Sequence, residues 1–339
     1  MSSDEPAEQR ILYDLDSVYL GNQQNSRLKS VTLTIRSGVT AVVGMSGAGK
    51  TSLLNLLSGF EHPDSGTIRR GGEFNRAGGG RLPMFWVPSG GGLWPHMTAG
   101  EHLINVHPDR EFAVRAGFAD KILKAFDLTH RTGAYPAELS QGERSRLSLA
   151  RAIVTGAEIL ILDEPLSHVD TIRQPKYWQI LREAVEEQGV SMIFSSHEPE
   201  TILRESSHVI CLDSGQVVWF GSTGALYHQP SSREAAMFLG PVNWVGGDQE
   251  KDSLPAAWIQ GSDLERVTGL RPESIEAEGD ERSALKVVVS VHRGWMSETQ
   301  VVDTLVGRTG VILHLTTGEH LRSGQGVRFV VRSSTKRGC

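Results

Sequence analysis

The sequence predicts a parallel α/β domain over residues 10–240 and a small all-β domain over residues 254–336. The first prediction depends on apolar runs such as Val39 to Val43 and Ile159 to Leu162, which suit strands buried in a parallel sheet. It also depends on the helical spacing of the leucines between residues 53 and 57. The second depends on short β-like segments without intervening helices, which are typical of a small barrel or sandwich.

The composition changes near residue 240, where two glycine-rich stretches indicate a linker over residues 241–253. Glycine-bearing turns separate most of the β-like segments beyond it. These segments are Leu285 to Val291, Gln300 to Val306, Gly310 to Leu315 and Gly326 to Val331.

Composition and charge exclude several classes of protein. A formal charge of −6 over 339 residues argues against a broad nucleic-acid-binding surface. Two cysteines, Cys211 and Cys339, are too few for a disulfide framework or a zinc site, so a reducing, cytosolic compartment is expected. The acidic start lacks the pattern of a secretory signal, and the longest apolar run, Ala235 to Leu239, is far shorter than a membrane span. If the protein works at a membrane, another chain must cross it.

A phosphate-binding loop follows the strand that ends at Val43. Residues Gly44 to Thr51 fit G-x-x-x-x-G-K-[ST], between an apolar strand and a helix that Gly59 would end. Backbone N–H groups and the helix N-terminus would hold phosphate oxygens, Lys50 would reach the β- and γ-phosphates, and Thr51 would bind Mg²⁺. A glycine turn that merely precedes a helix is the alternative. The predicted binding residues are Gly44, Ser46, Gly47, Ala48, Gly49, Lys50, Thr51 and Ser52.

On either side of this loop the sequence predicts strands, turns and helices in order. Residues 10–38 read as two strands joined by a turn, and Tyr19 on the first could stack on an adenine ring, although a packing role is the simpler reading for Tyr19 alone. Residues 60–92 are rich in turn formers, with Gly78 to Gly80 expected in a surface loop and Met84 to Val87 in a short strand. Residues 98–139 are expected to be helical.

A second helix start lies at Ser140, because Ser140 and Glu143 fit the S-x-x-E capping box. Ser140 and Gly142 would therefore lie at a helix N-terminus, a position that favours phosphate. Taken alone, the pattern indicates only that a helix begins here.

Two carboxylates, Asp163 and Glu164, end the next buried strand. In open α/β sheets, ligands bind beyond the carboxyl ends of the strands, so Asp163 is expected to hold Mg²⁺ through water and Glu164 to orient or deprotonate an attacking water. His197 follows the neighbouring strand and could contact a γ-phosphate, whereas a lone histidine there would usually be structural.

Taken together, these motifs resemble the ATP-binding subunits of ATP-binding cassette (ABC) importers that carry a C-terminal barrel, the type that serves iron(III), polyamine, sulfate, molybdate or sugar uptake. Residues 44–51 match Walker A, 139–143 the signature sequence, 163–164 Walker B with the catalytic carboxylate, and 167–170 the D-loop. His197 matches the switch histidine and Tyr19 the adenine-stacking aromatic. Arg271-Pro272-Glu273 is similar to a motif of the accessory barrel, the TOBE domain. The likeness covers residues 10–240 strongly.

The resemblance implies a P-loop NTPase cassette with a helical subdomain at about residues 93–155 and an OB-like, TOBE-like barrel. It implies an ATP hydrolase that binds ATP and Mg²⁺, with Glu164, His197 and Lys50 as catalytic residues. Two copies would form a head-to-tail dimer in which Ser140 and Gly142 of one chain complete the Walker A site of the other. Residues 86–105 would meet a separate membrane permease at the cytoplasmic face of the inner membrane, and a solute-binding protein would act indirectly.

The chain departs from the family pattern at two places. Ser89 stands where the Q-loop glutamine is expected, and a serine is too short to present an amide to Mg²⁺ and water together. The signature reads LSQGE, so Glu143 would repel a γ-phosphate unless it turns back to cap its own helix. We expect slower or altered hydrolysis. The alternatives are a soluble ABC ATPase without a transport role, and a weakly active cassette whose barrel senses a small oxyanion; the sequence names no transported solute.

Overall fold

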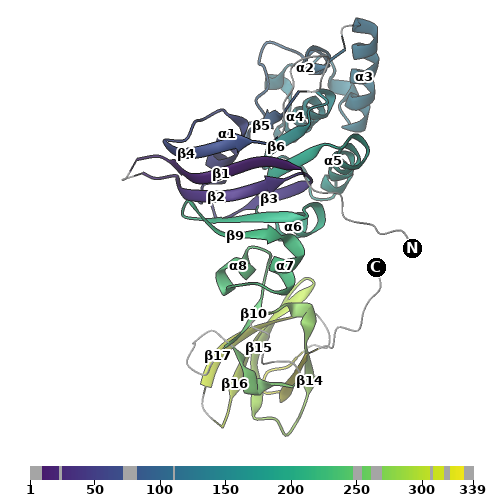
Figure 1. Ribbon diagram of the computed structural model, residues 1–339. Helices are drawn as coiled ribbons and strands as arrows, with labels where there is room; N and C mark the ends of the chain where they lie inside the picture. The colour runs from purple at the N-terminus through teal and green to yellow at the C-terminus, as the bar shows by residue number, and fades with distance from the viewer. Residues whose placement is uncertain are drawn as a thin grey trace, which may run out of the picture. The chain divides into compact units, whose positions relative to one another are not determined.

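The computed structural model (Figure 1) describes residues 10–22, 25–71, 82–109, 111–246, 254–260, 269–305, 308–316 and 321–331. The expected loop at residues 78–80, most of the expected linker and residues 332–336 lie outside these ranges. The chain divides into two compact units after Thr223. The short helices α7 (Thr223–His228) and α8 (Arg233–Met237), which fall within the predicted first domain, thus belong largely to the second unit.

The first unit is built on a six-stranded sheet of order β5-β6-β7-β3-β8-β9. All neighbours pair in parallel except β8 and β9, which form an antiparallel hairpin. The apolar residues of β3, β6 and β7 are buried, as expected of central strands in a parallel sheet. The strands are β5 (Phe85–Val87), β6 (Ile159–Asp163), β7 (Ser191–Ser195), β3 (Val39–Val43), β8 (His208–Asp213) and β9 (Gln216–Ser222).

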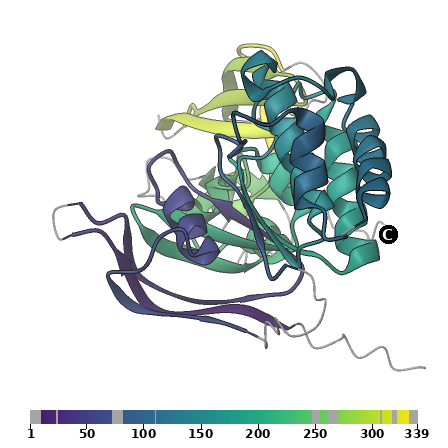
Figure 2. The ribbon, with the colours of Figure 1, turned by 90° about the horizontal axis from the view of Figure 1, so that it is seen from above.

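A second, antiparallel sheet of order β2-β1-β4 covers the helix that follows the phosphate-binding loop. Figure 2 shows α1 (Lys50–Ser58) between the two sheets. Its leucines at 53, 54, 56 and 57 are buried in one core with residues of both sheets, so the helical spacing read from the sequence corresponds to the buried face. The strands are β1 (Ile11–Leu20), β2 (Leu28–Arg36) and β4 (Ser65–Arg70).

The helices α2 (Ala99–Val106), α3 (Phe112–Ala125) and α4 (Gln141–Val154) gather at one end of the first unit (Figure 1). They fall within the range expected for a helical subdomain. Two capping boxes begin α2 and α4, at Thr98 with Glu101 and at Ser140 with Glu143, because each serine or threonine caps an N–H that has no partner within the helix. α5 (Gln174–Gln188) ends at Gly189 in a left-handed conformation, and α6 is Pro199–Glu205.

After α8, the described part of the second unit consists of strands and short 3-10 turns. They form three small sheets, of order β11-β10-β13, β12-β18-β14 and β15-β16-β17, around one apolar core. The strands are β10 (Asn243–Gly246), β11 (Leu254–Pro255), β12 (Ile259–Gln260), β13 (Gly269–Leu270), β14 (Ile275–Gly279), β15 (Leu285–Arg293), β16 (Met296–Asp303), β17 (Arg308–Thr316) and β18 (Val327–Val331).

Arg271 lies inside the second unit and organises its start. Its buried guanidinium donates to the carbonyl oxygens of Tyr227, Ala236, Gly240 and Pro241 at 3.0–3.2 Å. The R-P-E motif thus has a structural basis: its arginine donates to carbonyl groups near the end of α7, within α8 and just beyond α8.

Candidate active site

The loop between β3 and α1 has a backbone that requires glycine. Gly47 and Gly49 have φ angles of 81° and 106°, which side chains strongly disfavour. A Cβ atom on Gly49 would also lie 2.8 Å from the carbonyl oxygen of Arg27. The loop therefore presents its backbone, with Ser46 and Gly47 exposed, at the N-terminus of α1.

Lys50 begins α1 and folds back over this loop. Its ammonium group donates to the carbonyl oxygens of Gly44 at 2.8 Å and Met45 at 3.2 Å. These are neutral acceptors on the loop itself. A phosphate placed on the loop would offer charged oxygens to the same ammonium, and charge-assisted hydrogen bonds are about twice as strong as neutral ones.

Four side-chain and backbone groups from three elements meet at the carboxyl ends of β6 and β7. The Thr51 hydroxyl donates to Asp163 Oδ2 at 2.8 Å, and the Ser195 hydroxyl donates to Asp163 Oδ1 at 2.6 Å. The Ser195 oxygen also accepts the backbone N–H of Glu164 at 2.9 Å. Both oxygens of the buried Asp163 are thereby oriented, and the Glu164 backbone is tied to the same serine.

The pair formed by Thr51 and Asp163 fits Mg²⁺, because hydroxyl and carboxylate oxygens are the hard donors that this ion prefers. Within the described residues no group of three or more His, Cys, Asp or Glu side chains could hold a metal on its own.

Glu164 follows Asp163 in a left-handed backbone conformation, with φ of 47°. Its carboxylate is one-third exposed and lies 3.5 Å, Oε1 to Nδ1, from the more exposed imidazole of His197. Left-handed non-glycine residues are uncommon and cluster at functional sites. The structure thus connects Thr51, Asp163 and Glu164 through Ser195 and places His197 beside Glu164, whereas Lys50 contacts the phosphate-binding loop itself.

Ser140 and Gly142 lie at the start of α4, where the capping box uses the Ser140 hydroxyl as an acceptor for the Glu143 N–H. The Glu143 carboxylate turns back to the Ser140 N–H at 2.8 Å and pairs with Arg131 at 2.9 Å. Burial opposes its ionisation, but these hydrogen bonds outweigh burial and lower the pKa of Glu143 to about 2. Its charge is therefore engaged by the start of its own helix and by Arg131. Gly142 is pressed against the D-loop, since a Cβ there would lie 2.9 Å from the His168 carbonyl oxygen.

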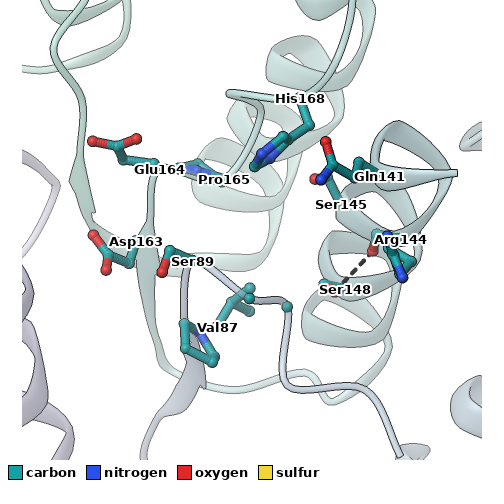
Figure 3. Close-up of a pocket in the computed structure, with 13 residues that line it drawn as sticks. Val87, Ser89, Gln141, Arg144, Ser145, Ser148, Asp163, Glu164, Pro165 and His168 are labelled. Atoms are coloured by element: carbon teal, nitrogen blue, oxygen red, sulfur yellow. Dashed lines mark hydrogen bonds between the residues drawn. The ribbon is translucent and has the colours of Figure 1, made fainter. Parts of the chain in front are cut away.

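Ser89 lines a pocket of about 140 Å³ together with Asp163 and Glu164. Figure 3 shows Asp163 and Glu164 on one side of this pocket and Gln141 and Arg144 of α4 on the other. Ser89, which stands at the sequence position expected for the Q-loop glutamine, lies next to Asp163 in this pocket (Figure 3).

Tyr19 lies on β1 with 41% of its surface exposed, so its ring is available for stacking. Ser195 was not among the residues singled out from the sequence, although it makes the most direct connection between Asp163 and Glu164. Its signal lay in the sheet: β6 and β7 are neighbours, and Asp163 pairs in register with Ser195. In the sequence, the corresponding signal is a serine at the end of the strand that follows Asp163 and Glu164.

Residues 28–167 match the ABC transporter family. The sulfate/thiosulfate import ATP-binding protein CysA of Gloeobacter violaceus is 30% identical over 86% of this chain and 85% of its own length. CysA 2 of Chromobacterium violaceum is 32% identical over 66% of this chain and 62% of its own. The Fe(3+) ions import ATP-binding protein FbpC 2 of Pectobacterium atrosepticum is 33% identical over 63% of each. In the latter two alignments, this chain spans about six-tenths of the relative's length.

Two solved structures have the same fold. One is an ATP-binding cassette in a dimeric, post-hydrolysis state bound to ADP and Pi, 23% identical, with a TM-score of 0.55 over 62% of this chain and 99% of that one. The other is an ATP-binding subunit of an ABC transporter, 21% identical, with a TM-score of 0.55 over 67% and 99%.

The site and these comparisons define the class: the chain is a P-loop NTPase with an ABC cassette. More narrowly, it belongs to the family of ABC-importer ATP-binding subunits. The predicted family and fold class, an α/β cassette followed by an all-β unit, are confirmed.

Proposed function

We propose that this protein hydrolyses ATP and that the hydrolysis powers solute import through a separate membrane permease. The observation that carries the proposal is the connected arrangement of Thr51, Asp163, Ser195 and Glu164 at the phosphate-binding loop. The import roles in the names of the relatives support it. Those names include sulfate/thiosulfate, Fe(3+) and spermidine/putrescine, so the proposal extends to solute import as a class.

The reaction is an in-line transfer of the γ-phosphoryl group of ATP to water. The loop N–H groups and Lys50 hold the phosphates, and Tyr19 offers its ring to the adenine. Mg²⁺, held by Thr51 and by Asp163 through water, would neutralise charge on the phosphates. Glu164 accepts a hydrogen bond from the attacking water and polarises it, and His197, 3.5 Å from Glu164, contacts the γ-phosphate. The residues that would hold phosphate, or hold Mg²⁺ directly or through water, are Gly44, Ser46, Gly47, Ala48, Gly49, Lys50, Thr51, Ser52 and Asp163.

A second copy of the chain completes the site. Ser140 and Gly142 lie at the N-terminus of α4, a helix of 14 residues whose first N–H groups carry partial positive charge. In a head-to-tail dimer they donate to the γ-phosphate held by the partner's loop. The dimeric cassette of the same fold supports this arrangement. Because Glu143 is engaged by Ser140 and Arg131, its charge is held back from that phosphate.

The permease supplies the path across the membrane. Among the residues that the structure describes, no helix has both the length and the apolar character that a bilayer crossing requires. We place the protein at the cytoplasmic face of the inner membrane, where residues 86–105 meet the permease and a solute-binding protein acts through it. The import function in the names of the relatives supports this placement.

The substitution Glu164→Gln tests the hydrolysis. An amide retains the shape of the side chain but cannot accept a proton, so turnover should fall about 10²- to 10⁴-fold. ATP should still bind, because none of the groups predicted to hold phosphate is changed. The measurements are steady-state phosphate release and equilibrium binding of a fluorescent ATP analogue.

Glu158→Gln is the matched control, since Glu158 forms only a surface ion pair with Arg10. It should keep wild-type turnover. Wild-type turnover in Glu164→Gln would remove Glu164 from the mechanism.

A further inference from the structure

Arg151 is a buried cation that no part of the proposed mechanism uses. It lies in the last turn of α4, is 3% exposed, and among the described residues forms no ion pair with any carboxylate. Burial lowers the pKa of its guanidinium to about 10, which still leaves it charged near neutral pH. A buried charge without a counterion is costly unless other groups satisfy it.

The carbonyl groups and rings that Arg151 contacts all belong to one segment, while its buried Nε has no hydrogen-bond partner among the described residues. Its Nη1 donates to the Gly92 carbonyl oxygen at 2.8 Å, and its Nη2 donates to the Gly91 carbonyl oxygen at 3.0 Å. The guanidinium carbon lies 5.4 Å from the ring centroid of Phe85 and 4.9 Å from that of Trp94. Cation–π contacts of this kind stabilise a desolvated arginine. Arg151 thus contacts residues before, within and after the loop that carries Ser89.

The same loop is pressed against the body of α4. Gly91 and Gly92 have φ angles of 78° and 57°, and a Cβ on Gly91 would lie 2.5 Å from the Ser148 hydroxyl oxygen. The Gly91 N–H donates to the Pro88 carbonyl oxygen at 2.7 Å, which closes a tight turn around Ser89. If the loop moved away from α4, Arg151 would lose both carbonyl acceptors at once. The position of the loop therefore determines whether the buried guanidinium keeps these two hydrogen bonds.

We propose that Arg151 is a positioning residue that fixes the loop of residues 88–92 to α4, so that the helix carrying Ser140 and Gly142 sets the place of Ser89 beside Asp163 and Glu164. Arg151 touches no reacting group. It acts through the loop, whose Ser89 lines the pocket next to the catalytic carboxylates. α4 carries Ser140 and Gly142 in its first turn and Arg151 in its last turn. A shift of α4 would therefore move the groups offered to the phosphate that the partner chain binds. It would also move the loop of residues 88–92 beside the site of its own chain. This inference rests on the proposed hydrolysis of ATP.

The test uses the full chain with Arg151→Met, which keeps an apolar stem and removes every donor, and Arg151→Lys, which keeps the charge but cannot bridge two carbonyls while stacking on two rings. Turnover should fall about 10- to 100-fold in Arg151→Met, the size expected of misplacement at a distance, and less in Arg151→Lys. The KM for ATP should stay unchanged, since the phosphate-binding loop is intact. Amide hydrogen exchange of residues 88–97 should increase, and that of α5 should not.

The matched control is Arg115→Met. Arg115 also lies on an aromatic ring in the helical region, 5.8 Å from Phe112, but its other contact is a long hydrogen bond to Ile104, away from the loop. It should leave turnover and loop exchange unchanged.

A folded Arg151→Met protein with wild-type turnover, or with exchange raised equally throughout α4 and α5, would overturn the proposal. If Arg151→Met does not fold, Arg151→Lys decides, and wild-type exchange of residues 88–97 in that variant would overturn it. If the wild-type chain hydrolyses no ATP, the proposed function fails. The hydrogen exchange of residues 88–97 in the Arg151 variants would still test whether Arg151 holds the loop.

Discussion

Two glycine loops lie at strand ends in the first unit, and in each a cation donates to loop carbonyl oxygens. Lys50 bonds to Gly44 and Met45 from within its own loop, whereas Arg151 bonds to Gly91 and Gly92 from a separate helix. Lys50 is only partly buried and can exchange its neutral acceptors for a phosphate. Arg151 is buried and has no such alternative. The arrangement at Lys50 is suited to binding a ligand. The arrangement at Arg151 is suited to holding the loop of residues 88–92 in a fixed position relative to α4.

The comparison is tested most strongly by Lys50→Ala. Removing the ammonium takes away a preorganised donor to the transferring phosphate, so turnover should fall about 10²- to 10³-fold. The affinity for ATP should fall as well, in contrast to Arg151→Met. Phosphate release and binding of a fluorescent ATP analogue would measure both. If Lys50→Ala kept its ATP affinity and Arg151→Met lost it, the contrast between the two loops would be reversed.

An intermediate effect is expected from Gly91→Ala. The left-handed φ of 78° and the approach to Ser148 should destabilise the protein by about 1–3 kcal/mol, measured by denaturant unfolding. Gly90→Ala is the matched control, because a Cβ on Gly90 would meet no atom within 4 Å. Equal stability of the two variants would show that the loop is not held against α4 as described.

The smallest effect is expected from Glu143→Gln at the other end of α4. Its folded pKa of about 2 lies below the ordinary value of 4.5, so the ionised carboxylate stabilises the fold above pH 4.5 and loses this contribution as the pH falls toward 2. A glutamine can still cap the helix but cannot pair with Arg131, so the variant should be less stable at pH 7 by up to about 1 kcal/mol. Unfolding at several pH values should show this difference shrinking below pH 4.5. A difference independent of pH would exclude the ionised pair as its source.

Much of the site was predictable because its signals are local. The phosphate-binding loop needs glycines at fixed spacing before a helix, and the capping box at Ser140 needs Glu143 three residues later. Asp163 and Glu164 follow a run of buried residues that any parallel sheet would place at its carboxyl edge. Each of these patterns falls within about ten residues, so the sequence alone was enough to find it.

The contacts of Ser195 and Arg151 could not be predicted in this way. Ser195 is 32 residues from Asp163 in sequence, and Arg151 is 60 residues from Gly91. Their roles depend on which strands are neighbours and on how α4 packs against a loop. In the sequence, Arg151 was one of several charges on a helix, and only the folded chain shows that its guanidinium meets Gly91 and Gly92.

The left-handed backbone at Glu164 has a consequence for the evolution of this sequence position. At this position glycine or asparagine would relieve backbone strain, so selection for stability alone would favour them over glutamate. Glu164 thus carries its carboxylate in a backbone conformation that disfavours its side chain. Copies of this cassette released from the need to hydrolyse ATP would therefore be expected to lose Glu164 early, and its presence in a chain is a sign of continued use.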